Sequence, residues 1–132
     1  MATSSQAQIL PNAYPRPYTA SGSIDFGCAV GYPDPDGLVS VATTGPFLGI
    51  AANAVVDGET CFVVLSGPAW VKIGGTVDWA TSPYLQPTTG GEFVEALGGI
   101  TSQVRAIPDA RQGDGAVTGD VLEALIAVGA FY

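Results

Sequence analysis

The stretch TCFVVL, residues 60–65, is an almost unbroken apolar run that ends at Ser66-Gly67-Pro68. Short apolar runs with β-branched and aromatic residues are typical of a strand that is covered on both faces. Turn residues bound the run, because Asp57-Gly58 precedes it and Gly67-Pro68 follows it. We therefore predict a buried strand over residues 60–65.

Segments of similar character recur along the chain from Ser23 onward. Ile24, Phe26, Cys28 and Val30 alternate with small or polar residues, which indicates a half-buried strand. Strands this short, separated by Gly and Pro turns roughly every 8–12 residues, predict an all-β protein, either a small barrel or a sandwich. The other predicted strands cover residues 38–42, 47–52, 70–73, 77–80, 92–97 and 100–107.

Residues 121–128 fit a helix and a strand about equally well. Leu122, Leu125 and Ile126 lie at helical spacing, and Asp120 with Glu123 matches a capping box. An internal repeat favours the strand, because it aligns this segment with residues 60–65. The repeat consists of three matched pairs of segments in the same order: 37–42 with 91–96, 48–51 with 105–108, and 58–63 with 119–124.

The offset in residue number grows from each of these pairs to the next, as loop insertions between strands would make it. The repeat predicts a β domain of two related halves, either a small barrel or a β-tulip-like domain. We expect this single domain to cover residues 22–132.

The N-terminal segment differs from the rest, because three prolines are interleaved with two tyrosines between Pro11 and Tyr18. Proline removes a backbone donor and favours extended geometry in the residue before it. We therefore predict an extended Pro-rich arm over residues 1–21 that is neither a helix nor an interior strand. Two interpretations stay open: a loose terminus, or an arm whose tyrosines dock on a neighbouring protein.

Composition excludes several classes of partner. The chain has 132 residues, enough for one domain, and 47% are apolar, enough for a core. Its formal charge is −8 and only four residues are basic, so it lacks the clustered cations that bind nucleic acid or anionic membrane surfaces. No apolar run approaches the ~18 residues of a membrane-spanning helix, and residues 1–10 lack the apolar core of a signal peptide. We expect synthesis in a host cytoplasm, with Cys28 and Cys61 as buried reduced thiols.

The sequence predicts no enzyme, no cofactor and no metal site. There is no histidine, the commonest general base and metal ligand, and the only two cysteines, Cys28 and Cys61, are too few and too far apart in sequence for a zinc site. Paired carboxylates could catalyse glycoside hydrolysis, but each candidate pair lies in a predicted turn, where Asp bonds its own backbone. These pairs are Asp34 with Asp36, Asp57 with Glu59, and Asp109 with Asp114.

Two tryptophans offer a binding surface. Trp70 and Trp79 flank the Gly74-Gly75 turn, so they could stack on a sugar together with Tyr84, which would make the domain a non-catalytic carbohydrate-binding module. The alternative is that both indoles pack in the core or at a subunit interface.

The order of these pieces resembles the capsid decoration, or cement, proteins of tailed bacteriophages. After the Pro-rich arm come Gly37-Leu38-Val39, Gly49-Ile50-Ala51, Gly58-Glu59 and Trp70-Val71-Lys72-Ile73, and the resemblance spans about residues 23–126. It implies a homotrimer on the virion that binds the major capsid protein from outside and stabilises the shell by bridging capsomers. The arm would supply Tyr14, Arg16 and Tyr18 as capsid contacts. A different virion structural subunit, such as a head fibre base or a minor shell protein, is a second alternative, after the carbohydrate-binding module.

Overall fold

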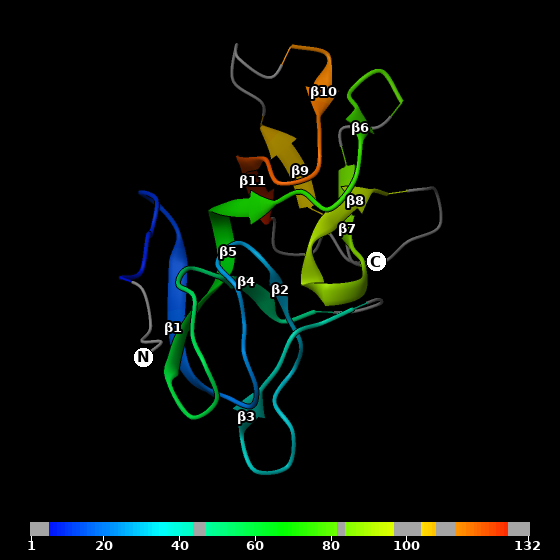
Figure 1. Ribbon diagram of the computed structural model, residues 1–132. Coiled ribbons are helices and arrows are strands. Elements are labelled where there is room, and N and C mark those ends of the chain that lie inside the picture. The colour runs from blue at the N-terminus through cyan, green and yellow to red at the C-terminus, as the bar shows by residue number, and fades with distance from the viewer. Residues whose placement is uncertain (1–5, 44–46, 82–83, 97–103, 108–112, 127–132) are drawn as a thin grey trace.

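The computed structural model describes residues 6–43, 47–81, 84–96, 104–107 and 113–126 (Figure 1). These residues form strands and one short 3-10 turn, η1 (Thr89–Gly91), so the all-β prediction is confirmed. The strands are β1 (Tyr14–Ala20), β2 (Ala29–Val30), β3 (Leu38–Val39), β4 (Gly49–Ala51), β5 (Thr60–Lys72), β6 (Val77–Asp78), β7 (Tyr84–Pro87), β8 (Phe93–Glu95), β9 (Val104–Ile107), β10 (Gly115–Ala116) and β11 (Val121–Ile126).

The first half of the chain closes nearly into a small barrel. The first part of β5 pairs antiparallel with β1 on one side and β4 on the other, and β4 pairs with β2. β3 lies parallel to β1, and a bridge from Val41 to Val30 brings the segment after β3 to β2. A closed ring of this kind leaves few free strand edges.

The second half repeats this arrangement with the later part of β5. That part pairs with β11, and the order continues through β9, β7 and β8. A parallel bridge between Ile73 and Phe93 then brings the ring back to the end of β5. Figure 1 shows the two halves side by side, with β5 passing from one into the other.

The pairing registers show that the two halves are structurally related. The pair Thr19–Thr60 in the first half corresponds to Lys72–Val121 in the second. Similarly, the β4 and β5 pair Ile50–Val64 corresponds to the β9 and β11 pair Arg105–Leu125. The structure therefore aligns Ile50 with Arg105, so the predicted match of Ile50 with Ile107 is wrong by two positions.

The turns before the last strand of each half also correspond. In the first half Glu59 Oε1 accepts from the amide of Val56, and Gly58 has a φ of 85°. In the second half Asp120 Oδ2 accepts from the amide of Val117, and Gly119 has a φ of 95°. Asp120 is thus a turn residue, and β11 follows it as a strand over Val121–Ile126, as the repeat predicted; residues 127 and 128 lie outside the described residues.

The structure corrects the prediction that a turn at Ser66-Gly67-Pro68 separates two strands. β5 runs through all three residues as one strand of 13 residues. Gly67 makes this possible with a φ of 85°, in tight contact with Asn12, and the register of β1 against β5 shifts nearby. The backbone amide of Lys72 points away from β11 and donates to Gly27 O. Amides of every second residue along a strand point to the same side, so the nitrogen of Pro68 also points away from β11. Its missing N–H therefore removes no hydrogen bond between β5 and β11.

The structure also corrects the prediction of a free arm, because Tyr14–Ala20 form β1 within the domain's own sheet. The backbone is extended, as the prolines predicted. The backbone amide of Ala20 donates to Glu59 O, so the amides of every second residue before Ala20 also point toward β5. The backbone nitrogens of Pro15 and Pro17 point the other way. Prolines on that side blunt a sheet edge, because they present no N–H to a foreign strand.

Two clusters of buried side chains fill the molecule. One lies within the first half and includes Ile24, Val39, Cys61 and Val63. The other combines the interior of the second half with the outward-facing side of β2, β4 and β5 in the first half. Its members include Ala29, Ile50, Val64, Val71, Leu85, Phe93, Leu122 and Ala124. The outer wall of the first half is therefore buried against the second half.

Candidate functional site

The described residues contain no group of three or more His, Cys, Asp or Glu side chains that could hold a metal ion. The carboxylates of the predicted turns serve the backbone, as Asp34 accepts from the amides of Asp36 and Leu38, and Asp57 accepts from Gly22. Asp109 lies outside the described residues. Among the described residues, no helix is long and apolar enough to cross a membrane.

β1 carries the three residues expected to contact a capsid, but it presents them unequally. Tyr14 is 50% exposed, and Arg16 Nη1 donates to the Tyr14 hydroxyl over 3.0 Å. This hydrogen bond raises the pKa of the Arg16 guanidinium. Tyr18 instead packs against the buried cluster of the first half. Tyr14 and Arg16 therefore form one exposed pair, and Tyr18 lies two residues further along β1, where it is partly buried.

The two tryptophans do not share a face. Trp70 lies on the outward side of β5, opposite Glu123 of β11, between the buried residues Ala69 and Val71. Trp79 packs against the core cluster of the second half, and its Nε1 is buried with no hydrogen-bond partner among the described residues. The structure thus does not bring Trp70 and Trp79 together as one stacking platform.

A surface that the sequence did not indicate lies on the outward side of β7, β9 and β11. The register places Tyr84 opposite Arg105, and Arg105 opposite Leu125. Tyr84 is 47% exposed and Ile107 is 39% exposed. We call Tyr84, Arg105, Ile107 and Leu125 the C-terminal wall. The alternation of Val104, Arg105, Ala106 and Ile107 in the sequence was the one available signal, since it separates buried from exposed positions.

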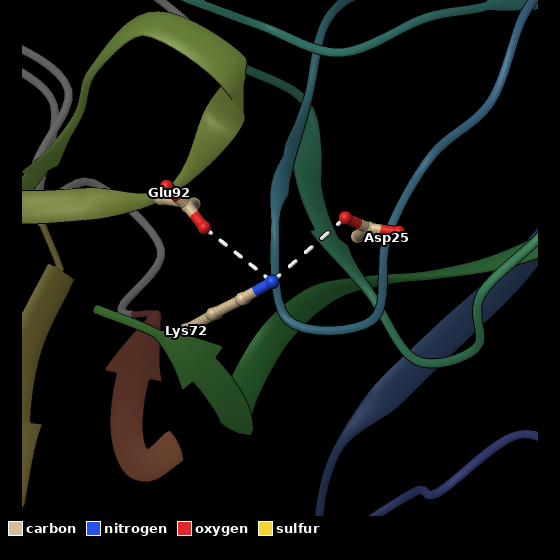
Figure 2. A network of polar contacts seen from close by, with 3 residues as sticks. All are labelled: Asp25, Lys72 and Glu92. Atoms are coloured by element: carbon tan, nitrogen blue, oxygen red, sulfur yellow. Dashed lines mark ion pairs between the residues drawn. The ribbon is translucent and has the colours of Figure 1, made fainter. Parts of the chain in front are cut away.

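An ion network joins the two halves. Lys72 Nζ lies 3.8 Å from Asp25 Oδ2 and 3.4 Å from Glu92 Oε2 (Figure 2). Burial acts to lower the pKa of Lys72, but the hydrogen bond to Glu92 and the charge of Asp25 outweigh burial, so the pKa is raised. All three side chains are partly exposed, so the network orients the halves more than it stabilises them.

Both cysteines are buried free thiols, as the sequence predicted. Loss of solvent raises the pKa of Cys61 to about 11, and for Cys28 burial, helped by the charge of Asp25, raises the pKa to about 11. The folded state therefore keeps these protons after the unfolded state, with a pKa of 9.0, has released them. The thiols' contribution to stability is complete below pH 9.0 and is lost as the pH rises toward 11.

We expect the wild-type protein to lose roughly 2 kcal/mol of unfolding free energy per thiol between these pH values. A Cys61→Ala variant should start less stable but decline less steeply. Urea denaturation at a series of pH values measures both slopes. Parallel curves for the two proteins would contradict this account.

Comparison with known proteins yields a likeness of fold. No family model matches the sequence, and no curated protein matches it either. Among solved structures, the head fiber gp8.5 N base in bacteriophage phi29 is similar, with a TM-score of 0.63 and 14% sequence identity. The match covers 87% of this chain and 94% of that one, so it spans both halves rather than a shared strand motif.

Proposed function

We propose that this chain is a structural protein of a bacteriophage virion and is displayed on the outside of the head. The observation that carries the proposal is the fold, which matches a head fiber base over 94% of that chain. Fold alone hosts many functions. One further feature agrees with a structural role, because the strand rings leave few free edges.

The proposed partner is the major capsid protein, and the proposed contact is the exposed pair Tyr14 and Arg16 on β1. Tyrosine and arginine are the residue types most often found at the energetic centre of an interface. A single weak contact suffices on a capsid, because a lattice presents it many times. The chain would act without catalysis, as a homotrimer that bridges capsomers or as the base of a longer fibre.

Point variants test this attachment better than a truncation. Removal of residues 1–18 would strip most of β1 from β5 and damage the fold. We expect Tyr14→Ala combined with Arg16→Ala to weaken binding to heads at least tenfold, in line with the roughly 2 kcal/mol of an interface centre. The measurement is the amount of protein that sediments with heads that lack it.

A matched control is Val117→Ala combined with Asp114→Asn, two exposed positions that flank β10. This variant should bind heads as the wild type does. Equal occupancy by the Tyr14 and Arg16 variant would discard β1 as the contact, and failure of the wild type to bind any head would discard the proposal. The temperature at which heads rupture distinguishes a homotrimer that bridges capsomers from the base of a longer fibre. A bridging protein must raise this temperature, and a fibre base need not.

A further inference from the structure

The contact between the two halves has two sides. On one side is the outer wall of the first half, where Ala29 and Ile50 are fully buried. On the other is the turn before β8. A Cβ built at Gly91 would lie 3.1 Å from Ala29 O, so glycine allows this turn to approach the wall closely. Phe93 continues the contact, because the centroid of its ring lies 5.9 Å from the centroid of the Phe47 ring.

The second half contains its own copy of the wall. By the register, Tyr84 and Arg105 pair as Ala29 and Ile50 do. These copies are exposed, whereas the originals are buried. Leu125, the equivalent of Val64, is half-buried. The C-terminal wall is thus the second-half equivalent of the outer wall of the first half. The outer wall of the first half is buried against the second half, whereas the C-terminal wall faces outward.

The first half contains its own copy of the turn. Gly91 donates to Thr88 O and Thr88 donates to Glu92 O, and the same pattern recurs when Gly37 donates to Asp34 O and Asp34 donates to Leu38 O. A Cβ at Gly37 would meet nothing within 4 Å, so this turn is in open space. We call residues 32–38 the acidic turn, since it presents Asp34, Asp36 and the 64%-exposed Tyr32.

Among the described residues, each side of the internal contact therefore has a second, exposed copy, and these two copies lie in different halves. Figure 1 shows the acidic turn beside β3 at the lower end of the molecule, far from β9 and β11. We propose that a second copy of this chain docks here, with the acidic turn of one copy on the C-terminal wall of the next. The charges agree, because Arg105 is one of only four basic residues and would face Asp36.

The contact between copies differs from the internal one in two ways. Tyr84 stands where the internal wall has Ala29, so the copies lie farther apart than the halves do, and long side chains span the gap. Thr19 and Leu38 stand where the second half has Lys72 and Glu92, so the network of Figure 2 has no counterpart between copies. The pair of Arg105 and Asp36 replaces it. A turn-to-wall contact is heterologous, so it generates a ring or an open chain.

Charge reversal on the full-length protein tests this contact, which goes beyond capsid attachment and needs no capsid. We expect Arg105→Glu to weaken self-association at least about tenfold in analytical ultracentrifugation, and Asp36→Lys to do the same. The double variant, which carries both changes, should regain self-association because its turn and wall are again complementary. Asp34 is left unchanged, since its carboxylate holds the turn.

A control variant makes a matched charge change elsewhere. Asp114→Lys lies immediately before β10, at an exposed position. It should self-associate as the wild type does. A second measurement is a disulfide between copies, formed when Asp36→Cys and Arg105→Cys proteins are mixed under mild oxidation; the native thiols are buried and stay out of this reaction.

Three results would overturn the proposal. One is a wild-type protein that stays monomeric at about 1 mM, because the contact would then be weaker than any useful association. Another is self-association that survives both single charge reversals and yields no crosslink. The third is a double variant that stays as weak as its parents, which would mean that the wall is a polar cap on the terminal repeat.

Discussion

Replacing Phe93 with alanine is expected to lower the free energy of unfolding by about 3–5 kcal/mol, the usual cost of removing a fully buried phenylalanine. Phe93 has no exposed surface and is the largest of the fully buried side chains that the structure describes. It bridges two features, because it closes the second ring against Ile73 and packs edge-on against Phe47 of the first half. The change would therefore open a cavity where the halves meet.

A domain of this size has about 5–15 kcal/mol of stability in total, so thermal unfolding should begin more than about 10 °C lower. Differential scanning calorimetry measures the shift. Phe62→Ala is the matched control, since Phe62 is 37% exposed on β5 and should cost far less. A Phe93→Ala protein that melts within about 2 °C of the wild type would show that this position is not a core contact.

Replacing Gly49 with alanine should cost about 3 kcal/mol, the upper part of the range for overpacking a well-filled interior. Gly49 lies on β4, and a Cβ built there would overlap the carbonyl oxygen of Val64 and press on the side chain of Val63. Backbone cannot yield as the end of a flexible side chain can. β4 must therefore move off β5, and the first ring loses part of its wall.

Gly31 provides the control for Gly49. A Cβ at Gly31 would lie 3.6 Å from Ser40 O, an ordinary contact, so Gly31→Ala should change stability by less than about 0.5 kcal/mol. Chemical denaturation of both variants gives the comparison. Equal stability of the two variants would mean that β4 can slide on β5 without cost.

Much of the strand content could be predicted from the sequence, because burial in a sheet leaves a local pattern. The apolar run at Cys61–Val64 and the alternation of Val104 to Ile107 both became strands. The limits of the strands were less predictable. Residues 24–28, for example, alternate like a strand, yet Ile24 makes only an isolated bridge to Val55 and the chain turns at once.

Two features escaped because they depend on pairing between distant segments. Gly67-Pro68 reads locally as a turn, and only β1 and β11 hold it within a strand. β1 itself looked like an arm, although one signal was present. Residues 22–26, Gly-Ser-Ile-Asp-Phe, match residues 75–79, Gly-Thr-Val-Asp-Trp. Extended backward, this match aligns residues 17–20 with residues 70–73, which the sequence predicts as a strand.

The candidate surfaces were only partly predictable. Tyr14 and Arg16 could be named from the sequence because they stand out in a Pro-rich segment, and the structure leaves both exposed. Arg105 could not be named, since nothing in its neighbourhood shows that Tyr84 and Leu125 lie beside it on other strands. The wall becomes meaningful only when the two halves are compared, and that comparison needs the registers.

A protein built from two similar halves commonly has a linker at which it can be cut, or at which one half melts before the other. Here the joint falls at Ser66 and Gly67, in the middle of β5. If β11 detaches from the later part of β5, the first part of the same strand is still paired with β1 and β4. The halves should therefore unfold in one transition, and a load applied to one half passes to the other through covalent bonds.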